Sequence, residues 1–219
     1  MSHLHIPDGV LPWWVWAPGL VFALVLLALG ARQARNESQL NVAIRGALGG
    51  LVLAAMAIEL PLGPVEYHLV LVGPVGVLLG AAGAFQVMFV VSAILAFAGH
   101  GGFTVVGLNA LVLGAGAAIA RPLYRSLSSK LAPGPALAVT SAGAQALSGL
   151  AWLAVVALAL RFGMAASPAR VGWIGALTLP LWLLGLAVEA AVGYGLGRFL
   201  ARVRPDLLPV RPGARVEAA

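Results

Sequence analysis

Long apolar runs separated by short polar segments dominate the chain. Each run is close to the roughly 20 residues that an α-helix needs to cross a bilayer. The first begins near Leu11, opens with Trp13, Trp14 and Trp16, and ends near Ala31. Tryptophans gathered at one end of such a run are typical of a membrane–water interface. The other runs cover about 44–60, 69–98, 103–120, 136–160 and 173–200.

The run from 69 to 98 is long enough for one tilted helix or for two short helices hinged near residues 80–83. The basic residues decide between them, because Lys and Arg concentrate on the cytoplasmic side of membrane proteins. Two spans place eleven of them inside, at 32, 35, 45, 121, 125, 130, 198, 202, 204, 211 and 215, and two outside, at 161 and 170. The sequence therefore predicts an all-α, polytopic membrane protein of about seven transmembrane helices, with the N-terminus outside and the C-terminus cytoplasmic.

Composition agrees with a membrane protein and excludes other classes. Hydrophobic residues make up 61% of the chain and charged residues 9%, whereas roughly 25% of the residues of soluble proteins are charged. The net charge of +6 does not indicate nucleic-acid binding, because the basic residues lie at the ends of apolar runs. Cysteine is absent, which excludes a thiolate metal site. We expect an external arm at 1–10, a transmembrane bundle at 11–201 and a basic cytoplasmic tail at 202–219.

The four histidines are the candidate functional residues, because all of them fall on the predicted outer side. His3 and His5 lie in the arm, His68 precedes the third apolar run, and His100 follows it. Imidazole is the commonest metal ligand among side chains, and the terminal amine is a further nitrogen donor near the first two. Shortly after His5 come Pro7, Asp8 and Gly9. Residues of these types favour a turn, so the arm can fold back. The sequence therefore predicts a metal-binding N-terminal arm.

Polar residues inside the apolar runs have more than one explanation. Glu189 lies in the last run, where a carboxylate is a functional hypothesis by default, but a partner on a neighbouring helix explains it equally well. We do not assign it to the metal. Polar side chains inside such runs, here Asn109 and Gln145, more often form hydrogen bonds between helices than bind a ligand.

Small residues recur at helical spacing in two of the runs. Such spacing places them on one helix face, where another backbone can approach closely. We expect these faces to receive helices of partner proteins, with packing inside the bundle as the alternative. The residues are Gly76, Gly80 and Gly83 in one run and Gly107, Ala110 and Gly114 in the next.

Three segments together resemble the CbiM/NikM proteins, the substrate-binding membrane components of energy-coupling factor transporters for cobalt and nickel. They are the residues His5-Ile6-Pro7-Asp8-Gly9, His68 at the head of a glycine-containing run, and the stretch from His100-Gly101-Gly102 to Asn109. The resemblance extends to about residue 123. It implies a seven-helix fold whose N-terminal segment inserts toward the bundle centre from outside.

The same resemblance implies the roles of the site residues. In nickel-type members the terminal amine, the amide and imidazole of the adjacent histidine, and a second histidine bind the metal in one plane. The second histidine matches His68. For the segment at His100 the resemblance implies a structural role or a role in orienting a ligand by hydrogen bonding. We expect Asp8 and Asn109 to have the same kind of role.

The start of the chain departs from the family pattern, which usually begins Met-His. Here Ser2, His3 and Leu4 separate Met1 from His5. Three arrangements stay open: His3 acts after removal of Met1, His3 completes a chelate with Met1 retained, or His5 binds by its side chain alone. Translation starting at the codon of Leu4 would restore the family's Met-His.

We expect a metal-capture subunit with no catalysis and no prosthetic cofactor, which carries Co(II) or Ni(II) as its transported ligand. No G-x-x-x-x-G-K-[ST] motif occurs, so ATP would be hydrolysed by a partner. The expected partners are a transmembrane coupling subunit, ATP-binding cassette subunits, a small accessory membrane subunit and lipid, but no nucleic acid. An intramembrane metalloenzyme would need a motif such as H-E-x-x-H, which is absent. A stand-alone secondary transporter should show paired repeats, and none is evident.

Overall fold

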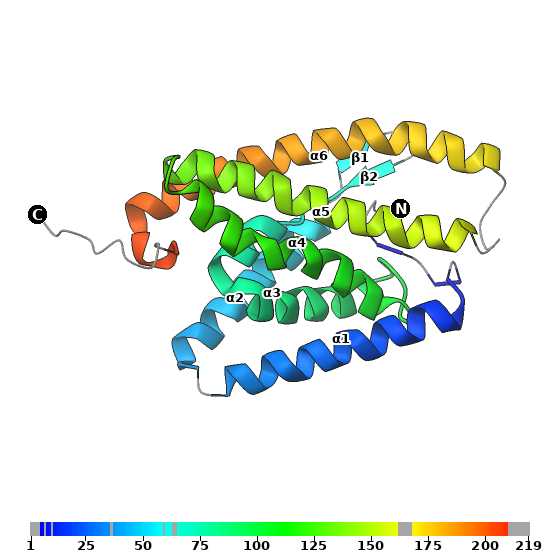
Figure 1. Ribbon diagram of the computed structural model, residues 1–219, viewed down its shortest axis with the longest axis horizontal. Coiled ribbons are helices and arrows are strands. Elements are labelled where there is room, and N and C mark those ends of the chain that lie inside the picture. Colours follow the sequence, from blue (N-terminus) through cyan, green and yellow to red (C-terminus); the bar gives the residue numbers. More distant parts are fainter. Residues whose placement is uncertain are drawn as a thin grey trace, which may run out of the picture.

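The computed structural model is a bundle of long helices (Figure 1). It describes residues 5–209 apart from 7, 10, 36, 59, 63–64 and 162–167. Within that part, a short antiparallel pair of strands and one 3₁₀ turn accompany six α-helices. The elements are α1 (Trp13–Ala34), α2 (Gln39–Ala57), β1 (Leu60–Leu62), β2 (Val65–Tyr67), α3 (Val72–Phe97), α4 (Val106–Leu127), α5 (Pro133–Arg161), α6 (Pro168–Val203) and η1 (Pro205–Leu207).

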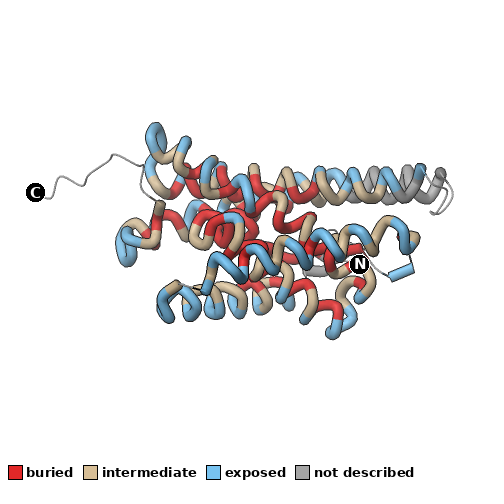
Figure 2. Tube along the Cα trace, turned by 60° about the horizontal axis from the view of Figure 1, so that its bottom comes forward, coloured by how far each residue is buried: buried red, intermediate tan, exposed pale blue. Residues whose placement is uncertain are grey.

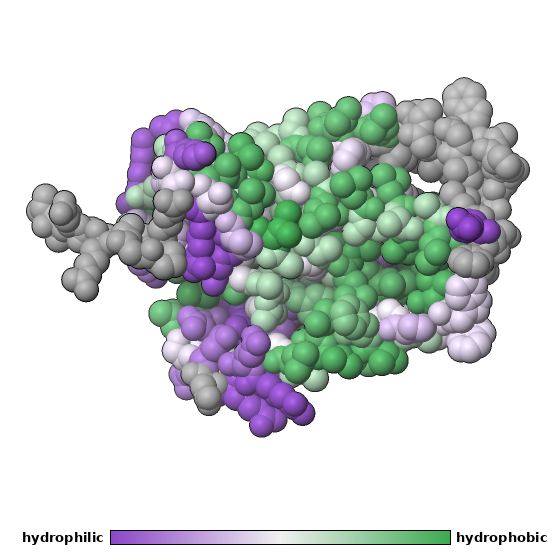
Figure 3. Space-filling view, in the orientation of Figure 1, coloured by the Kyte–Doolittle hydropathy of each residue, from purple (hydrophilic) through white to green (hydrophobic). Residues whose placement is uncertain are grey.

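All six helices are long and apolar enough to cross a membrane. A lipid environment favours helices because each backbone N–H and C=O finds its partner within the same segment. Apolar residues form a broad band across the middle of the molecule, while hydrophilic residues gather at the end where the C-terminus lies (Figure 3). The α1–α2 and α4–α5 connections and the end of α6 share that end (Figure 1). The chain is therefore a multi-pass helical membrane protein.

The core lies around α3 and α4, and α1 and α2 are the most peripheral helices. Buried residues concentrate along the middle helices, while the outer helices are largely exposed (Figure 2). Val21 of α1 is 61% exposed and Val42 of α2 is 57% exposed. Exposed aliphatic side chains of this kind are suited to contact with lipid tails.

The third helix is folded back on itself at Gly80. A straight helix of 26 residues would be about 39 Å long at 1.5 Å per residue. Yet the rings of His68 and His100, which flank α3, have centroids only 6.0 Å apart. The reversal takes place at Gly80, whose φ of 72° and ψ of 177° are not helical. Glycine is suited to this position because it has no Cβ to oppose a positive φ. The helix therefore has two limbs, 72–79 and 81–97.

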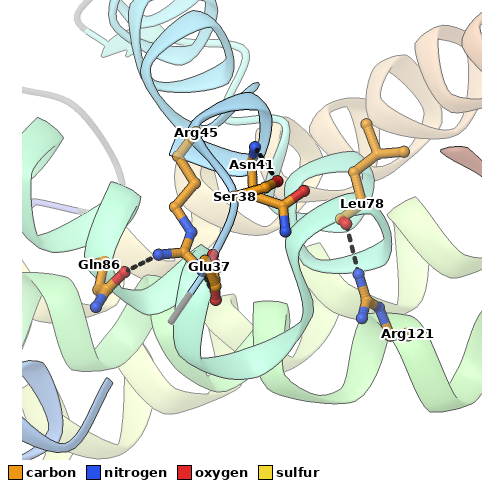
Figure 4. A network of polar contacts seen from close by, with 7 residues as sticks. All are labelled: Glu37, Ser38, Asn41, Arg45, Leu78, Gln86 and Arg121. Atoms are coloured by element: carbon orange, nitrogen blue, oxygen red, sulfur yellow. Dashed lines mark hydrogen bonds and ion pairs between the residues drawn. The ribbon is translucent and has the colours of Figure 1, made fainter. Parts of the chain in front are cut away.

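An arginine from α4 completes the reversal. The Nε atom of Arg121 donates to the carbonyl of Val77 at 2.8 Å. Its terminal nitrogen donates to the carbonyl of Leu78 at 2.5 Å, as Figure 4 shows. These carbonyls lie in the last turn of the first limb, where helical carbonyls lose their partners. A guanidinium can satisfy both because its donors form a rigid fork.

A second arginine ties the start of α2 to the second limb of α3. Arg45 pairs with the carboxylate of Glu37 and also donates to Gln86 at 3.0 Å (Figure 4). Both arginines therefore hold the reversal in place from the same end of the bundle.

The prediction of a hinge near residues 80–83 is confirmed at Gly80, but the described residues contain six long helices rather than seven separate ones. The chain reverses inside an unbroken apolar run, so no polar loop divides α3 into two elements. The short strands β1 and β2 are a further departure from a purely helical chain.

The expectation that two glycine-rich faces receive partner helices is wrong for these residues, because they pack inside the bundle. A Cβ on Gly76 would collide with the backbone of Ala117, and one on Gly107 would lie 2.5 Å from Leu20 of α1. Gly83 faces the side chain of Arg45 in the same way. The spacing shows that one face of a helix carries small residues, but it does not show which neighbouring helix packs against that face.

We expect Gly76→Ala to destabilise the bundle. Its new methyl group would lie 2.7 Å from the Cβ of Ala120 and would overlap the Ala117 carbonyl, and overpacking of this kind typically costs about 1–3 kcal/mol. Gly46→Ala is the matched control, since nothing lies within 4 Å of its added Cβ. Thermal unfolding in detergent, followed by circular dichroism, should show a lower Tm for Gly76→Ala alone. Equal Tm values would contradict this packing.

Candidate metal centre

The N-terminal arm is held against the start of α4 by a backbone-like pairing with Asn109. The Oδ1 atom of Asn109 accepts a hydrogen bond from the N–H of Ile6 at 2.8 Å, and its Nδ2 donates to the carbonyl of Ile6 at 3.2 Å. The N–H of Gly102 donates to the same carbonyl at 3.1 Å. The side chain of Ile6 is buried with Leu11 and Val105. These contacts fix the arm at Ile6 and thereby position the preceding residue, His5.

The carboxylate of Asp8 makes a second attachment at the entrance to α4. It accepts hydrogen bonds from the N–H of Phe103 at 2.8 Å, from the N–H of Thr104 at 2.9 Å and from the hydroxyl of Thr104. The hydroxyl of Thr104, followed by the two backbone groups, lowers the pKa of Asp8. The carboxylate is therefore ionised at neutral pH and the attachment is charge-assisted.

Two glycines allow the arm to approach this closely. A Cβ on Gly102 would lie 2.6 Å from the Cγ atom of Asp8, which leaves no room for any side chain. Gly101 has a φ of +95°, and a Cβ there would lie 3.5 Å from the Cβ of His5. The Gly-Gly pair that follows His100 thus accommodates the arm.

His68 is prepared to bind through one ring nitrogen. Its Nδ1–H donates to the carbonyl of Met56, in the last turn of α2, at 2.6 Å. This bond selects the tautomer in which Nε2 carries a lone pair. In the part of the chain that the structure describes, Nε2 is buried and has no hydrogen-bond partner. A buried acceptor without a partner is unfavourable unless something binds it, so His68 has the features of a ligand.

His5 and His100 lie beside His68. The rings of His68 and His100 meet edge to face with centroids 6.0 Å apart. Burial, and then the neighbouring rings of His68 and His100, lower the pKa of His5 from 6.5 to about 4. At neutral pH the imidazole of His5 is therefore uncharged, which is the form that binds metals. Three imidazoles, from segments far apart in the sequence, converge at this end of the bundle.

The described residues do not supply a complete set of metal ligands. No group of three His, Cys, Asp or Glu side chains is arranged there to hold an ion. His3, a candidate ligand from the sequence, and Met1 lie outside the described residues. The structure brings together His5, His68 and His100 and places Asp8 and Asn109 where they anchor the arm. A site here would need further donors, such as backbone nitrogen or the terminal amine.

Glu189 contacts this region in a way that the sequence left open. It is fully buried in α6, and its Oε1 atom accepts hydrogen bonds from the N–H groups of Val70 and Leu71, which follow His68. In the sequence, Glu189 is notable only as a carboxylate inside an apolar run, which indicates that the side chain has a buried partner or a function. Its partner proved to be backbone rather than a side chain of a neighbouring helix.

Comparison with known proteins fits this geometry. Residues 5–207 match the model of the CbiM family, described as the cobalt uptake substrate-specific transmembrane region. The chain belongs to the CbiM family. The matched region begins at His5 and includes the arm, both flanks of α3 and all six helices.

Relatives of this CbiM-family chain are metal transport proteins. A protein from Haemophilus influenzae named "Putative metal transport protein" is 28% identical over 210 residues, which cover 94% of this chain and 97% of that protein. Crystal structures of a transition metal transporter and of a truncated transition metal transporter share the fold, each with a TM-score of 0.68 and 17% identity. The truncated form aligns with 90% of this chain and 98% of its own, and the other with 91% and 93%.

We expect Asn109→Ala to release the arm, because it leaves the buried N–H of Ile6 without an acceptor, a loss worth about 1–3 kcal/mol. Hydrogen–deuterium exchange measured by mass spectrometry should then be faster for residues 102–104, whose amides are covered by the arm. Glu37→Ala, at the opposite end of the bundle, is the control and should leave that exchange unchanged. Unchanged exchange in Asn109→Ala would show that the pairing does not hold the arm.

Proposed function

We propose that this CbiM-family chain is the substrate-capture component of an ATP-driven importer for cobalt or nickel. The observation that carries the proposal is His68, whose Nε2 atom is buried without a partner among the described residues while Nδ1 is fixed by Met56. A histidine held by one nitrogen and open at the other is the usual arrangement of a metal-binding imidazole. The metal is the cargo, and the chain catalyses no reaction.

The cargo binds between the arm and His68. His5 supplies an uncharged imidazole, and the N-terminus supplies amine and amide nitrogens. Such an all-nitrogen set suits Ni(II) in a planar site. If the imidazole of His5 binds without the amine, the site is less planar and Co(II) is favoured. His100, 6.0 Å from His68 between ring centroids, orients the site, and Asp8 and Asn109 keep the arm closed over it.

The arm faces the outside of the cell and the arginine-rich end faces the cytoplasm. The α1–α2 and α4–α5 connections and the end of α6 share one end of the bundle (Figure 1). Arg45 lies near the start of α2, Arg121 near the end of α4, and Arg204 directly after α6, and positive residues favour the cytoplasmic side. Counting the two limbs of α3 separately, the chain has seven helical segments. Because the two limbs return to the same side, we expect the N-terminus outside and the basic tail, 202–219, inside.

Energy for transport comes from partners. The sequence has no G-x-x-x-x-G-K-[ST] loop, so ATP-binding cassette subunits hydrolyse ATP and a transmembrane coupling subunit connects them to this chain. A small accessory membrane subunit is a further partner. The complex resides in the cytoplasmic membrane.

Calorimetric titration of the purified protein with Ni(II) and Co(II) tests the site. We expect His68→Ala and His5→Ala each to weaken binding by at least about 10-fold, since even residues that only support a ligand change affinity by about 10–100-fold. Lys130→Ala, an exposed residue between α4 and α5, is the control and should bind as the unmodified chain does. Unchanged affinity in both histidine variants would refute the site.

The same titration separates the roles of His3 and His5. If His3 is the ligand, acetylating the terminal amine should abolish tight binding, and His3→Ala should be as damaging as His68→Ala. If His5 binds by its side chain alone, the amine is irrelevant and His5→Ala is the severe change.

Cysteine labelling in intact cells tests the orientation, because the chain has no native cysteine. Ala98 and Ser129 are exposed residues that follow α3 and α4. We expect Ala98→Cys to react with a membrane-impermeant maleimide in intact cells and Ser129→Cys to react only after permeabilisation. The reverse pattern would invert the topology.

A further inference from the structure

Helix α6 is attached to the chain on both sides of His68. Before it, the hydroxyl of Tyr67 donates to the carbonyl of Gly185 at 3.2 Å. After it, the N–H groups of Val70 and Leu71 donate to Oε1 of Glu189 at 2.6 and 3.0 Å. Gly185 and Glu189 are four residues apart and therefore lie on the same face of α6. One helix face thus fixes the residues that flank the candidate ligand.

The attachment at Glu189 holds a backbone conformation that is unfavourable by itself. Leu71 has a φ of 57° and is the one non-glycine residue of the described chain with a positive φ. That conformation is unfavourable for an L-residue, because its Cβ lies too close to the following carbonyl oxygen, and it persists only where surrounding contacts impose it. Two hydrogen bonds to one buried carboxylate, at Leu71 and at the residue before it, supply such contacts.

The same carboxylate lies next to the N-terminus of α3. Leu71 precedes the first turn of that helix, and no side chain of its own caps it. Negative charge at a helix N-terminus is favourable because the N–H groups there have no partner within the helix. Glu189 takes both of its hydrogen bonds from backbone, and its Oε2 atom has no hydrogen-bond partner in the described part of the chain. In the described part of the chain, Glu189 therefore forms hydrogen bonds with the backbone N–H groups of Val70 and Leu71 and not with another side chain.

We infer that Glu189 is a positioning residue for the metal site: it fixes the chain at Val70 and Leu71 and so sets the position and tautomer of the His68 ring. The inference about the tautomer stands on the contacts above. Its consequence for metal affinity rests on the proposed function.

The tautomer gives a test that needs no metal. In protein labelled with ¹⁵N-histidine, the NMR shifts of the two ring nitrogens of His68 distinguish Nδ1–H from Nε2–H, and a His68→Gln sample identifies the signals. We expect Nδ1–H in the unmodified chain, as its bond to Met56 requires. Glu189→Gln keeps an oxygen that can accept both N–H groups and should preserve the signal, whereas Glu189→Leu should lose it or average it with the other tautomer. A signal unchanged in Glu189→Leu would overturn the inference.

Ser148→Ala is the control for general loosening of the bundle. It removes a buried hydrogen bond from the hydroxyl of Ser148 in α5 to the carbonyl of Leu113 in α4, and leaves the bonds of Glu189 in place. The His68 signal should not change in this variant. If Glu189→Leu does not fold, Glu189→Asp serves in its place, because shortening the side chain by one bond of about 1.5 Å moves the oxygen beyond hydrogen-bond distance.

Metal titration then tests whether Glu189 acts through His68. We expect Glu189→Leu to weaken Ni(II) or Co(II) binding about 10–100-fold, as loss of a group supporting a ligand does, and Glu189→Gln to restore most of it. In a His68→Ala background, Glu189→Leu should have no further effect. Additive losses would overturn the positioning role. If the unmodified chain binds neither metal, the proposed function fails, and the NMR result still decides the role of Glu189.

Discussion

The structure depends on one constraint, that every backbone polar group within the bilayer must find a partner inside the protein. Helices meet it by themselves. Where the chain departs from a helix, a polar side chain from another element completes the hydrogen bonding. Asn109 pairs with Ile6 in the arm, Glu189 with Val70 and Leu71, and Arg121 with the carbonyls before Gly80. Three of the polar residues of this apolar chain therefore complete the hydrogen bonding at its irregular points.

These irregular points bring the three histidines together. Six straight helices with their side chains would not bring residues 5, 68 and 100 together. The reversal at Gly80 returns the chain to the level of His68. The hydrogen bonds of Asp8 with Phe103 and Thr104 then hold the arm at the same end of the bundle. The relative positions of His5, His68 and His100 are therefore set by the parts of the backbone that are not helical. The scaffold and the site are therefore stabilised by the same small set of buried polar contacts.

The sequence predicted the apolar runs, the position of the hinge and the candidate residues His5 and His68, because these depend on local composition. It did not predict what completes the reversal, since the guanidinium that does so comes from Arg121, 44 positions from its partner Val77. It misassigned the face of Gly76 for the same reason. The partner of Glu189 lies 119 residues away at Val70, and no local pattern records such a pairing.

The attachment of the arm can also be described as the binding of a tethered peptide. Gly9 is only four residues from Trp13, where α1 begins, and a tether of that length keeps a ligand at an effective concentration of roughly millimolar. A handful of hydrogen bonds is then sufficient to keep the arm bound nearly all the time, although the same peptide free in solution would bind poorly. Weak intrinsic binding also means rapid release, so the arm can open and close again without unfolding of the bundle.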